Sequence, residues 1–399
     1  MEKQTKKYLF SLQGFYLLAF FGVGSITPLL SVYLTDVEKL SGMQIGTILS
    51  LGPIMMIIFQ PIWGMVSDLT NEPPKVLTLT TFLAGIFGFG YLVFHQYSLF
   101  ILTAVLVAVF QSAIIPVSDS ISIKYATKIR YNYGNIRLFG SLGFGLAVFV
   151  MGRLSEYSPT VIFYTFFIAL AIASILAFRL PKEAASARVN LLEGMKELFI
   201  MKKFILFLLI TFLIFGPNLA NNFYFGLFVD KTGGSYTGIG IAFLIAVLSE
   251  IPFMRISGRW IDKFGLLPIA AIAGSISMVR WFFYFLEPSL TLVYASAIIQ
   301  GLSIGLFIPA GLQYIRDITP IHITATAVTI YSAIGNGLGN WFSTFFGGII
   351  YEKYSIFHVY LFFGILTLLG VLLNLWLIKE EKSFLLRKSA IGLKKDDPV

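Results

Sequence analysis

The chain has 399 residues, of which 57% are hydrophobic and only 12% are charged, so it carries more apolar surface than a soluble protein of this length could bury. This composition places it in a lipid bilayer. Its basic and acidic residues give a net charge of +9, and the lack of cysteine excludes disulfides, thiolate metal sites and thiol nucleophiles.

Apolar runs recur along the chain, each long enough to cross a membrane, since roughly 20 helical residues span about 30 Å of hydrocarbon. The runs lack the two-residue alternation that a barrel strand requires, so each is predicted to be a helix. The twelve predicted crossings are residues 9–34, 44–66, 76–94, 98–122, 136–154, 160–178, 204–229, 238–257, 266–286, 290–315, 323–350 and 356–378.

Basic residues are unevenly distributed over the loops. If the N-terminus is cytoplasmic, only four of the 29 Lys and Arg residues lie in outer loops, and these are Lys39, Arg153, Lys231 and Lys353. The positive-inside rule therefore predicts a protein of the cell membrane with both termini in the cytoplasm. The positive charge then serves topology and contact with anionic lipid, and no nucleic-acid partner is expected.

The longest polar stretch divides the crossings into six and six. It is charged and has the pattern of a short amphipathic helix. We predict an N-terminal six-helix bundle over residues 1–180, a cytoplasmic linker over 181–203, a C-terminal six-helix bundle over 204–378 and a mobile cytoplasmic tail over 379–399.

The two halves resemble each other at a steady offset. "GMVSD" at 64–68 recurs as "GRWID" at 258–262, and Ile45-Gly46 recurs as Ile239-Gly240, both 194 residues later. "GRLSE" at 152–156, followed by "YTFF", matches "GIIYE" at 348–352, followed by "YLFF", 196 residues later. This constant order predicts a duplication. Because each half has six crossings, the copies form a parallel repeat about a pseudo-two-fold axis along the membrane normal.

Twelve helices, this duplication and a Gly-x-x-x-Asp motif after helices 2 and 8 together resemble the major facilitator superfamily. The resemblance implies that Gly64, Asp68, Gly258 and Asp262 take part in gating at the cytoplasmic face. The second copy, "GRWIDKFG", keeps the pattern of the superfamily, whereas the first has prolines at 73–74 where a glycine and a basic run are usual.

Asp119 ends predicted helix 4 and Arg137 begins helix 5, so both flank one loop and can face each other at similar depth. Arg137 by position alone fits an interfacial cation as well as a functional residue. The segment 134–144 resembles helix 5 of the lactose permease and of related nucleoside:proton symporters and phenylpropionate permeases. That resemblance implies that Arg137 and Asp119 hold solute hydroxyls and that Phe144 stacks on a ring.

The second half offers amides in its first helix. Pro217 frees a backbone carbonyl, and Asn218, Asn221 and Asn222 cluster over about one turn, which suits either a polar ligand or hydrogen bonds between helices. Gln300, in helix 10, is a further candidate for binding solute.

Two ionisable residues lie deep in the second half, where charges are costly and usually functional. By axial rise, Glu250 falls near mid-bilayer and Arg280 in the outer half. They are predicted either to form a static ion pair or to couple transport to protons, a role that Asp119 could share. Arg137 is a possible substitute for Arg280 as the partner of Glu250. The resemblance implies a histidine and an acid in helix 10, and both are absent here.

Other chemistries are disfavoured. "GLSIG" at 301–305 fits a hydrolase elbow, but no strand precedes it, and the three histidines fall near different loops, so no metal site or triad is predicted. The chain lacks a P-loop. We therefore expect no enzyme and no cofactor beyond a proton gradient.

The pattern is typical of a secondary active transporter that works by alternating access as a monomer in the bilayer. We predict proton-coupled uptake of a small polar or organic-acid solute, such as a sugar, a nucleoside or an aromatic acid. The alternatives are a proton-coupled efflux antiporter of amphipathic compounds and a receptor or scaffold with a transporter fold.

Overall fold

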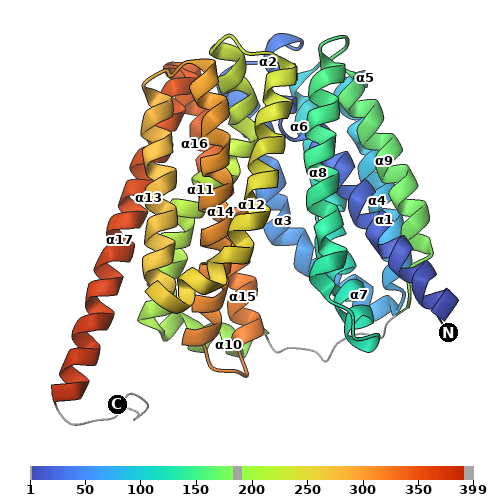
Figure 1. Cartoon of the computed structure of the whole chain (residues 1–399). Helices are drawn as coiled ribbons and strands as arrows, with labels where there is room; N and C mark the ends of the chain where they lie inside the picture. Colours follow the sequence, from blue (N-terminus) through green and yellow to red (C-terminus); the bar gives the residue numbers. More distant parts are fainter. Residues whose placement is uncertain (1, 183–190, 391–399) are drawn as a thin grey trace.

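A computed structural model describes residues 2–182 and 191–390, which are almost entirely helical (Figure 1). The first half contains α1 (Glu2–Ile26), α2 (Leu30–Asp36), α3 (Gly42–Thr70), α4 (Pro73–Gly88), α5 (Gly90–Val93), α6 (Tyr97–Gln111), α7 (Ile114–Lys128), α8 (Tyr133–Ser155) and α9 (Val161–Phe178). After α10 (Leu191–Ile200), the second half contains α11 (Lys202–Lys231), α12 (Tyr236–Phe264), α13 (Leu266–Phe285), α14 (Leu290–Ile318), α15 (Thr324–Ser332), the π-helix η1 (Ala333–Gly339), α16 (Asn340–Lys353) and α17 (Ile356–Ala390).

The structure confirms the predicted all-helical membrane architecture. Within residues 2–182 and 191–390, eleven helical segments are long and apolar enough to cross a membrane, and each matches a predicted crossing. The remaining predicted crossing, 323–350, is also helical, but η1 divides it into α15 and α16, which are too short to qualify singly. The interruption lies in a glycine-rich stretch, since η1 has the sequence "AIGNGLG". Here the chain packs closely on α11, because a Cβ on Gly216 of α11 would lie only 2.6 Å from the carbonyl carbon of Gly339.

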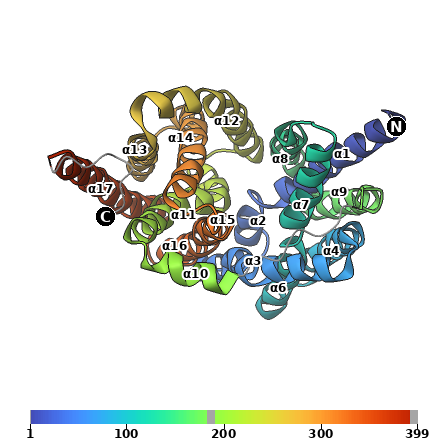
Figure 2. The same ribbon diagram turned by 90° about the horizontal axis from the view of Figure 1, so that it is seen from below.

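The two halves form separate groups of helices when seen from the end that carries the termini (Figure 2). We call this end the terminal end and the opposite one the distal end. At the distal end, α3 packs on α16 and α8 packs on α12. A Cβ on Gly46 would lie 2.6 Å from the Cα of Gly348, so these backbones touch across the halves.

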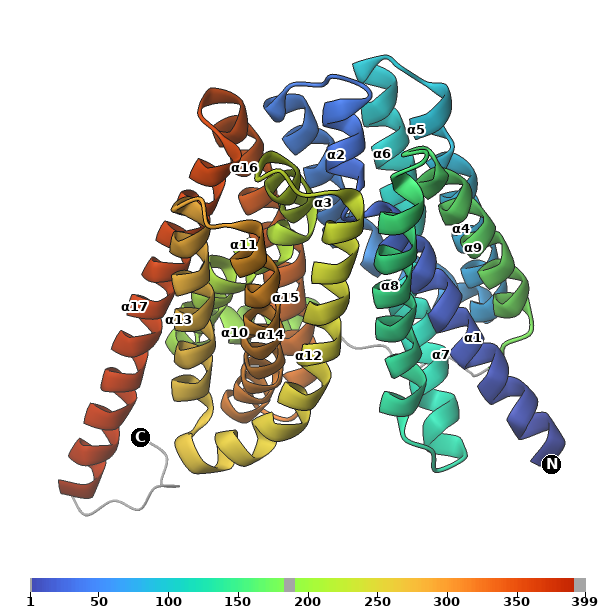
Figure 3. The same cartoon turned by 45° about the horizontal axis from the view of Figure 1, so that its top comes forward.

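Toward the terminal end the ribbons of the two halves diverge (Figure 3). Asp68 and Asp262 are exposed there, and a Cβ on Gly64 or Gly258 would meet no neighbour within 4 Å. The predicted gating residues are therefore apart, and the halves meet at their distal ends. Their predicted role belongs to the state in which the terminal ends of the halves are closed, so it stays a prediction.

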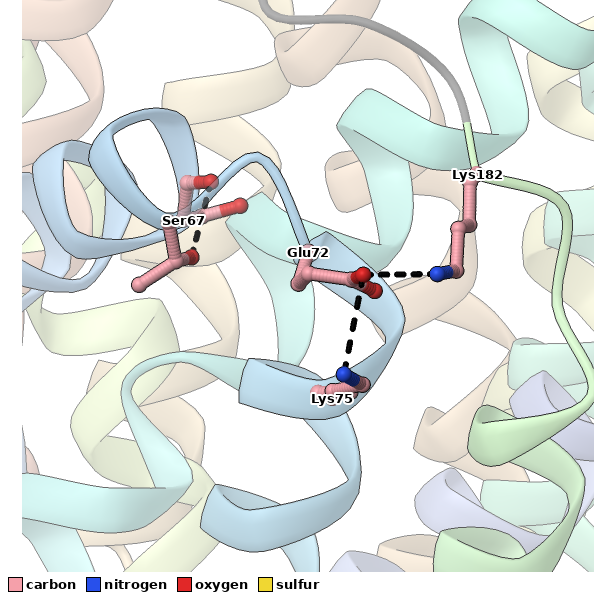
Figure 4. Close-up of polar contacts among 5 residues, drawn as sticks. Ser67, Glu72, Lys75 and Lys182 are labelled. Carbon is pink, nitrogen blue, oxygen red and sulfur yellow. Dashed lines mark hydrogen bonds and ion pairs between the residues drawn. The ribbon is translucent and has the colours of Figure 1, made fainter.

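The segment between the halves contains the predicted short helix, α10, whereas residues 183–190 lie outside the described residues. Just before that gap, Lys182 donates to Glu72 at 2.6 Å, and Lys75 lies 3.6 Å from the same oxygen (Figure 4). Glu72 thus ties the loop after α3 to the residues after α9, in the loop that departs from the superfamily pattern.

The last helix runs past the predicted end of its crossing, since α17 continues to Ala390. Ion pairs join the charged turn of α17 to the start of α11: Lys202 lies 2.7 Å from Glu380, and Lys203 lies 3.1 Å from Glu381. The first part of the predicted tail is therefore helical. Residues 391–399 lie outside the described residues.

Candidate functional site

The first half places Asp119 of α7 and Arg137 of α8 face to face, as expected of two residues that flank one loop. The Nε of Arg137 lies 3.8 Å from an Asp119 carboxylate oxygen, and the Tyr16 hydroxyl of α1 donates to the same oxygen. Arg137 is 32% and Asp119 27% exposed, so a solute can reach both. The carboxylate compensates the arginine and leaves donors of its guanidinium available.

Aromatic rings of α1 hold the Arg137 side chain from one face. Its guanidinium carbon lies 4.4 Å from the centre of the Phe20 ring and 5.6 Å from that of Tyr16, within the range of cation–π contacts. Tyr133 adds a hydroxyl beside Asp119. The planar fork is thereby fixed in orientation before any ligand arrives.

Glu250 of α12, in the second half, lies within electrostatic range of this cluster, and Arg137 is the cation whose charge acts on it. Arg280 bonds to Gln300 and Tyr284, so the predicted static pair with Glu250 is not formed among the described residues. Depth along the membrane normal, from which that pair was predicted, says nothing about which way a side chain points around its helix. Arg137, the substitute partner that the sequence also offered, is the cation that acts on this acid.

Arg280 is buried in a separate network inside the second half, with only 3% exposure. It donates to Gln300 at 2.7 Å and to the Tyr284 hydroxyl at 3.0 Å. Its guanidinium carbon lies 4.7 Å from the Trp281 ring centre and 5.0 Å from that of Tyr284. The buried charge is thus balanced by an amide oxygen and aromatic faces, while its Nη1 atom has no partner in the described structure.

The predicted amides of α11 divide between two roles. Asn221 accepts from Tyr360 at 3.0 Å and lies 3.5 Å from Gln300, so it belongs to the network of Arg280. Asn218 accepts from Ser277 at 3.1 Å, which links α11 to α13 as a hydrogen bond between helices. Asn222 is half-buried.

Phe144 reaches the other half, where its ring packs edge-on against Phe243 at 6.5 Å between centres. The rings that contact Arg137 are those of Tyr16 and Phe20. No sequence signal separates Phe20 from the many other phenylalanines of this chain, whereas Tyr16 has a hydroxyl in an otherwise apolar run.

A cavity of about 180 Å³ is lined mostly by residues of the first half, and it adjoins the arginine cluster at Phe20. Phe20 lines it on one side, and Phe223 and Asn340 of the second half line it on another. Its wall is largely apolar, with polar groups from Thr27 and Gln111. Phe20 therefore lies both at the cavity wall and against Arg137.

Among the described residues, no group of three or more His, Asp or Glu side chains could hold a metal ion. The polar groups around Arg137 include the carboxylates of Asp119 and Glu250 and the phenolic hydroxyls of Tyr16 and Tyr133. Such a set suits recognition of hydroxyls and movement of protons between carboxylates.

Comparison with known proteins decides the family. A profile of the MFS_1 like family matches residues 9–362. The chain belongs to this family. It is 53% identical to the uncharacterized transporter YwbF of Bacillus subtilis (strain 168) over 95% of this chain and 96% of that protein. It is 46% identical to the maltose permease of Geobacillus stearothermophilus, with the same coverage.

The solved structure of the nucleoside transporter NupG matches with a TM-score of 0.84 at 18% identity, over 93% of this chain and 99% of that one. At that identity the match shows the fold alone, and it confirms the predicted twelve-helix major facilitator fold. The family match and the two permease-like relatives, together with the apolar helices, show that the protein is a multi-pass membrane transporter and not an enzyme.

Proposed function

We propose that this transporter imports a sugar, most specifically a glucoside of disaccharide size, by proton-coupled symport across the cell membrane. The observation that carries the proposal is the partly exposed pair of Arg137 and Asp119 in the first half, to which the buried Tyr16 donates a hydrogen bond. Its donors and acceptors match the paired hydroxyls of a sugar ring. The 46% identity to a protein named maltose permease supports this solute class.

Recognition of the solute rests on the planar guanidinium of Arg137 and the carboxylate of Asp119. Arg137 offers planar donors to two neighbouring hydroxyls, while Asp119 accepts from hydroxyls on the same ring. Phe20 gives the adjoining cavity an apolar wall against which the flat face of a second ring packs. Phe223 and Asn340 of the second half also line the cavity, so the proposed site includes residues of both halves and is suited to alternating access.

Coupling is assigned to Glu250, with Asp119 as the alternative. Solute that binds Arg137 competes with the attraction between Arg137 and Glu250, so binding changes the affinity of Glu250 for a proton. Arg280, buried beside Gln300, keeps a predicted part in the coupling network. We place both termini in the cytoplasm by the positive-inside rule and treat the monomer as the working unit.

Uptake into proteoliposomes tests the proposal. Purified protein is reconstituted with its orientation determined, and radiolabelled maltose is offered with and without an inward proton gradient. Accumulation above the external concentration only with the gradient supports symport. Gradient-driven expulsion would contradict uptake and would indicate efflux. The alternative of efflux is included because the chain is also 23% identical to the quinolone resistance protein NorA of Staphylococcus aureus.

A panel of nucleosides, aromatic acids and monosaccharides, offered as competitors, defines the solute class. Maltose that neither accumulates nor is displaced by any sugar would contradict the sugar assignment. In that case, transport of another member of the panel identifies the class.

A further inference from the structure

A glutamate of the second half contacts the first turn of a helix of the first half at the distal end. Glu352, near the end of α16, accepts from the Ser41 hydroxyl at 2.7 Å and from the Met43 backbone N–H at 2.7 Å. Ser41 is the N-cap of α3. The carboxylate therefore completes the cap of a helix in the other half, where free N–H groups and the helix dipole favour an anion.

The same arrangement occurs in the opposite direction. Glu156, directly after α8, accepts from the Thr237 backbone N–H at 2.9 Å, in the first turn of α12. Ser235 is the N-cap of α12 and also bonds to Glu156. Each half thus contributes one glutamate and receives one.

The internal duplication relates the two contacts. Glu156 and Glu352 each follow a glycine by four residues, Gly152 and Gly348, and the two motifs are 196 residues apart. Their partners Ser41 and Ser235 are 194 residues apart. The contacts are therefore two copies of one device and not isolated surface bonds.

Close packing supports both copies. A Cβ on Gly152 would lie 2.6 Å from the Tyr236 carbonyl oxygen, and one on Gly348 would lie 2.7 Å from the Gly42 carbonyl oxygen. The helices approach at backbone distance beside each glutamate. Separation of the halves at this end must break both carboxylate contacts.

We propose that Glu156 and Glu352 are paired latches that hold the distal ends of the halves together, and that their release is a step of the transport cycle. They are positioning residues, since they lie away from the arginine cluster. The latch rests on alternating access and not on the identity of the solute, so it survives if the solute class proves different.

Charge around Glu156 agrees with this role. The hydrogen bond from the Thr237 backbone and, further, the Ser235 side chain hold the pKa of Glu156 below its ordinary value of 4.5, with a smaller contribution from Arg153. On the facing helix, Tyr236 is a titratable group on which the charge of Glu156 acts, together with the charges of Asp36 and Asp230. The contact is strongest with Glu156 ionised, and an amide at this position would weaken it.

The test measures the distance across the distal end. Spin labels at cysteines replacing Val93 and Leu292, exposed positions of opposite halves, report it by pulsed electron resonance in a chain without native cysteines. Glu156→Gln and Glu352→Gln should each raise the ratio of open to closed populations about fivefold, as expected for loss of one charge-assisted bond. The double variant should show roughly the product of the two effects.

The matched control is Glu287→Gln, which removes an exposed carboxylate at the same end. Among the described residues, no hydrogen bond joins Glu287 to the first half. Glu156→Asp and Glu352→Asp keep the charge and should restore part of the closed population. Unchanged distances in a well-folded double variant, or an equal shift in Glu287→Gln, would overturn the latch.

Discussion

Two arginines within the membrane segments, Arg137 and Arg280, occupy contrasting surroundings. Arg137 is 32% exposed, lies beside a carboxylate and faces the other half, whereas Arg280 is 3% exposed and bonds to an amide and a phenol of its own half. A charge that binds solute must be reachable and only partly compensated. A charge sealed among aromatic rings organises a bundle and transmits changes between helices. In the proposed function, the first half is therefore assigned recognition through Arg137, and the Arg280 network of the second half is assigned support.

Replacing Arg137 by lysine gives the largest expected effect. An ammonium is a point charge and cannot reproduce the planar fork over Phe20, so transport should fall at least about 100-fold while membrane insertion is kept. Uptake assays at matched expression measure this. Arg130→Lys, at an exposed position, is the control, and wild-type uptake by Arg137→Lys would remove this residue from the site.

Glu250→Gln separates coupling from binding. The amide imitates a permanently protonated acid, so accumulation driven by a pH gradient should fall to equilibrium, a concentration ratio of about one, because no proton is released. Exchange of labelled for unlabelled solute should continue. Should the variant still concentrate solute, the coupling role passes to Asp119, and Asp119→Asn is the next variant to measure.

The sequence predicted the surroundings of Arg137 better than those of Arg280. Asp119 and Arg137 flank one short loop, which fixes both their depth and their facing, and the structure brings them together. Glu250 and Arg280 lie on different helices, and a count of axial rise leaves their angular positions open. The rings of Phe20 and Tyr360 could not be singled out, because aromatic side chains are abundant in every apolar helix of this chain.

Arg280→Lys tests the supporting role of the second region. Lysine cannot keep the bonds to both Gln300 and Tyr284, and it buries a strongly hydrated ammonium. We expect the free energy of unfolding to fall by about 2 kcal/mol. Thermal unfolding in detergent should show this loss, whereas Arg137→Lys should not, and equal loss in both variants would erase the contrast.

The smallest effect concerns the loops at the terminal end, which also differ between the halves. The second copy turns on Gly265 with a positive φ of 90°, whereas the first is clamped by Glu72 between Lys182 and Lys75. The hydrogen bond from Lys182 holds the pKa of Glu72 below its ordinary value of 4.5. The stabilisation is therefore fully present above pH 4.5 and is lost as the pH falls through the lowered pKa.

Lys182→Met should remove this pH dependence. Because the pair is exposed and screened, the melting temperature above pH 5 should fall by only about 1 °C, and the wild type and the variant should converge in acid. Lys75→Met, which removes the more distant partner at 3.6 Å, should have less effect. A constant difference between Lys182→Met and the wild type at every pH would instead assign Lys182 a packing role. Neither half would then have an electrostatic clamp in its loop at the terminal end, and the two halves would differ only in the surroundings of their arginines.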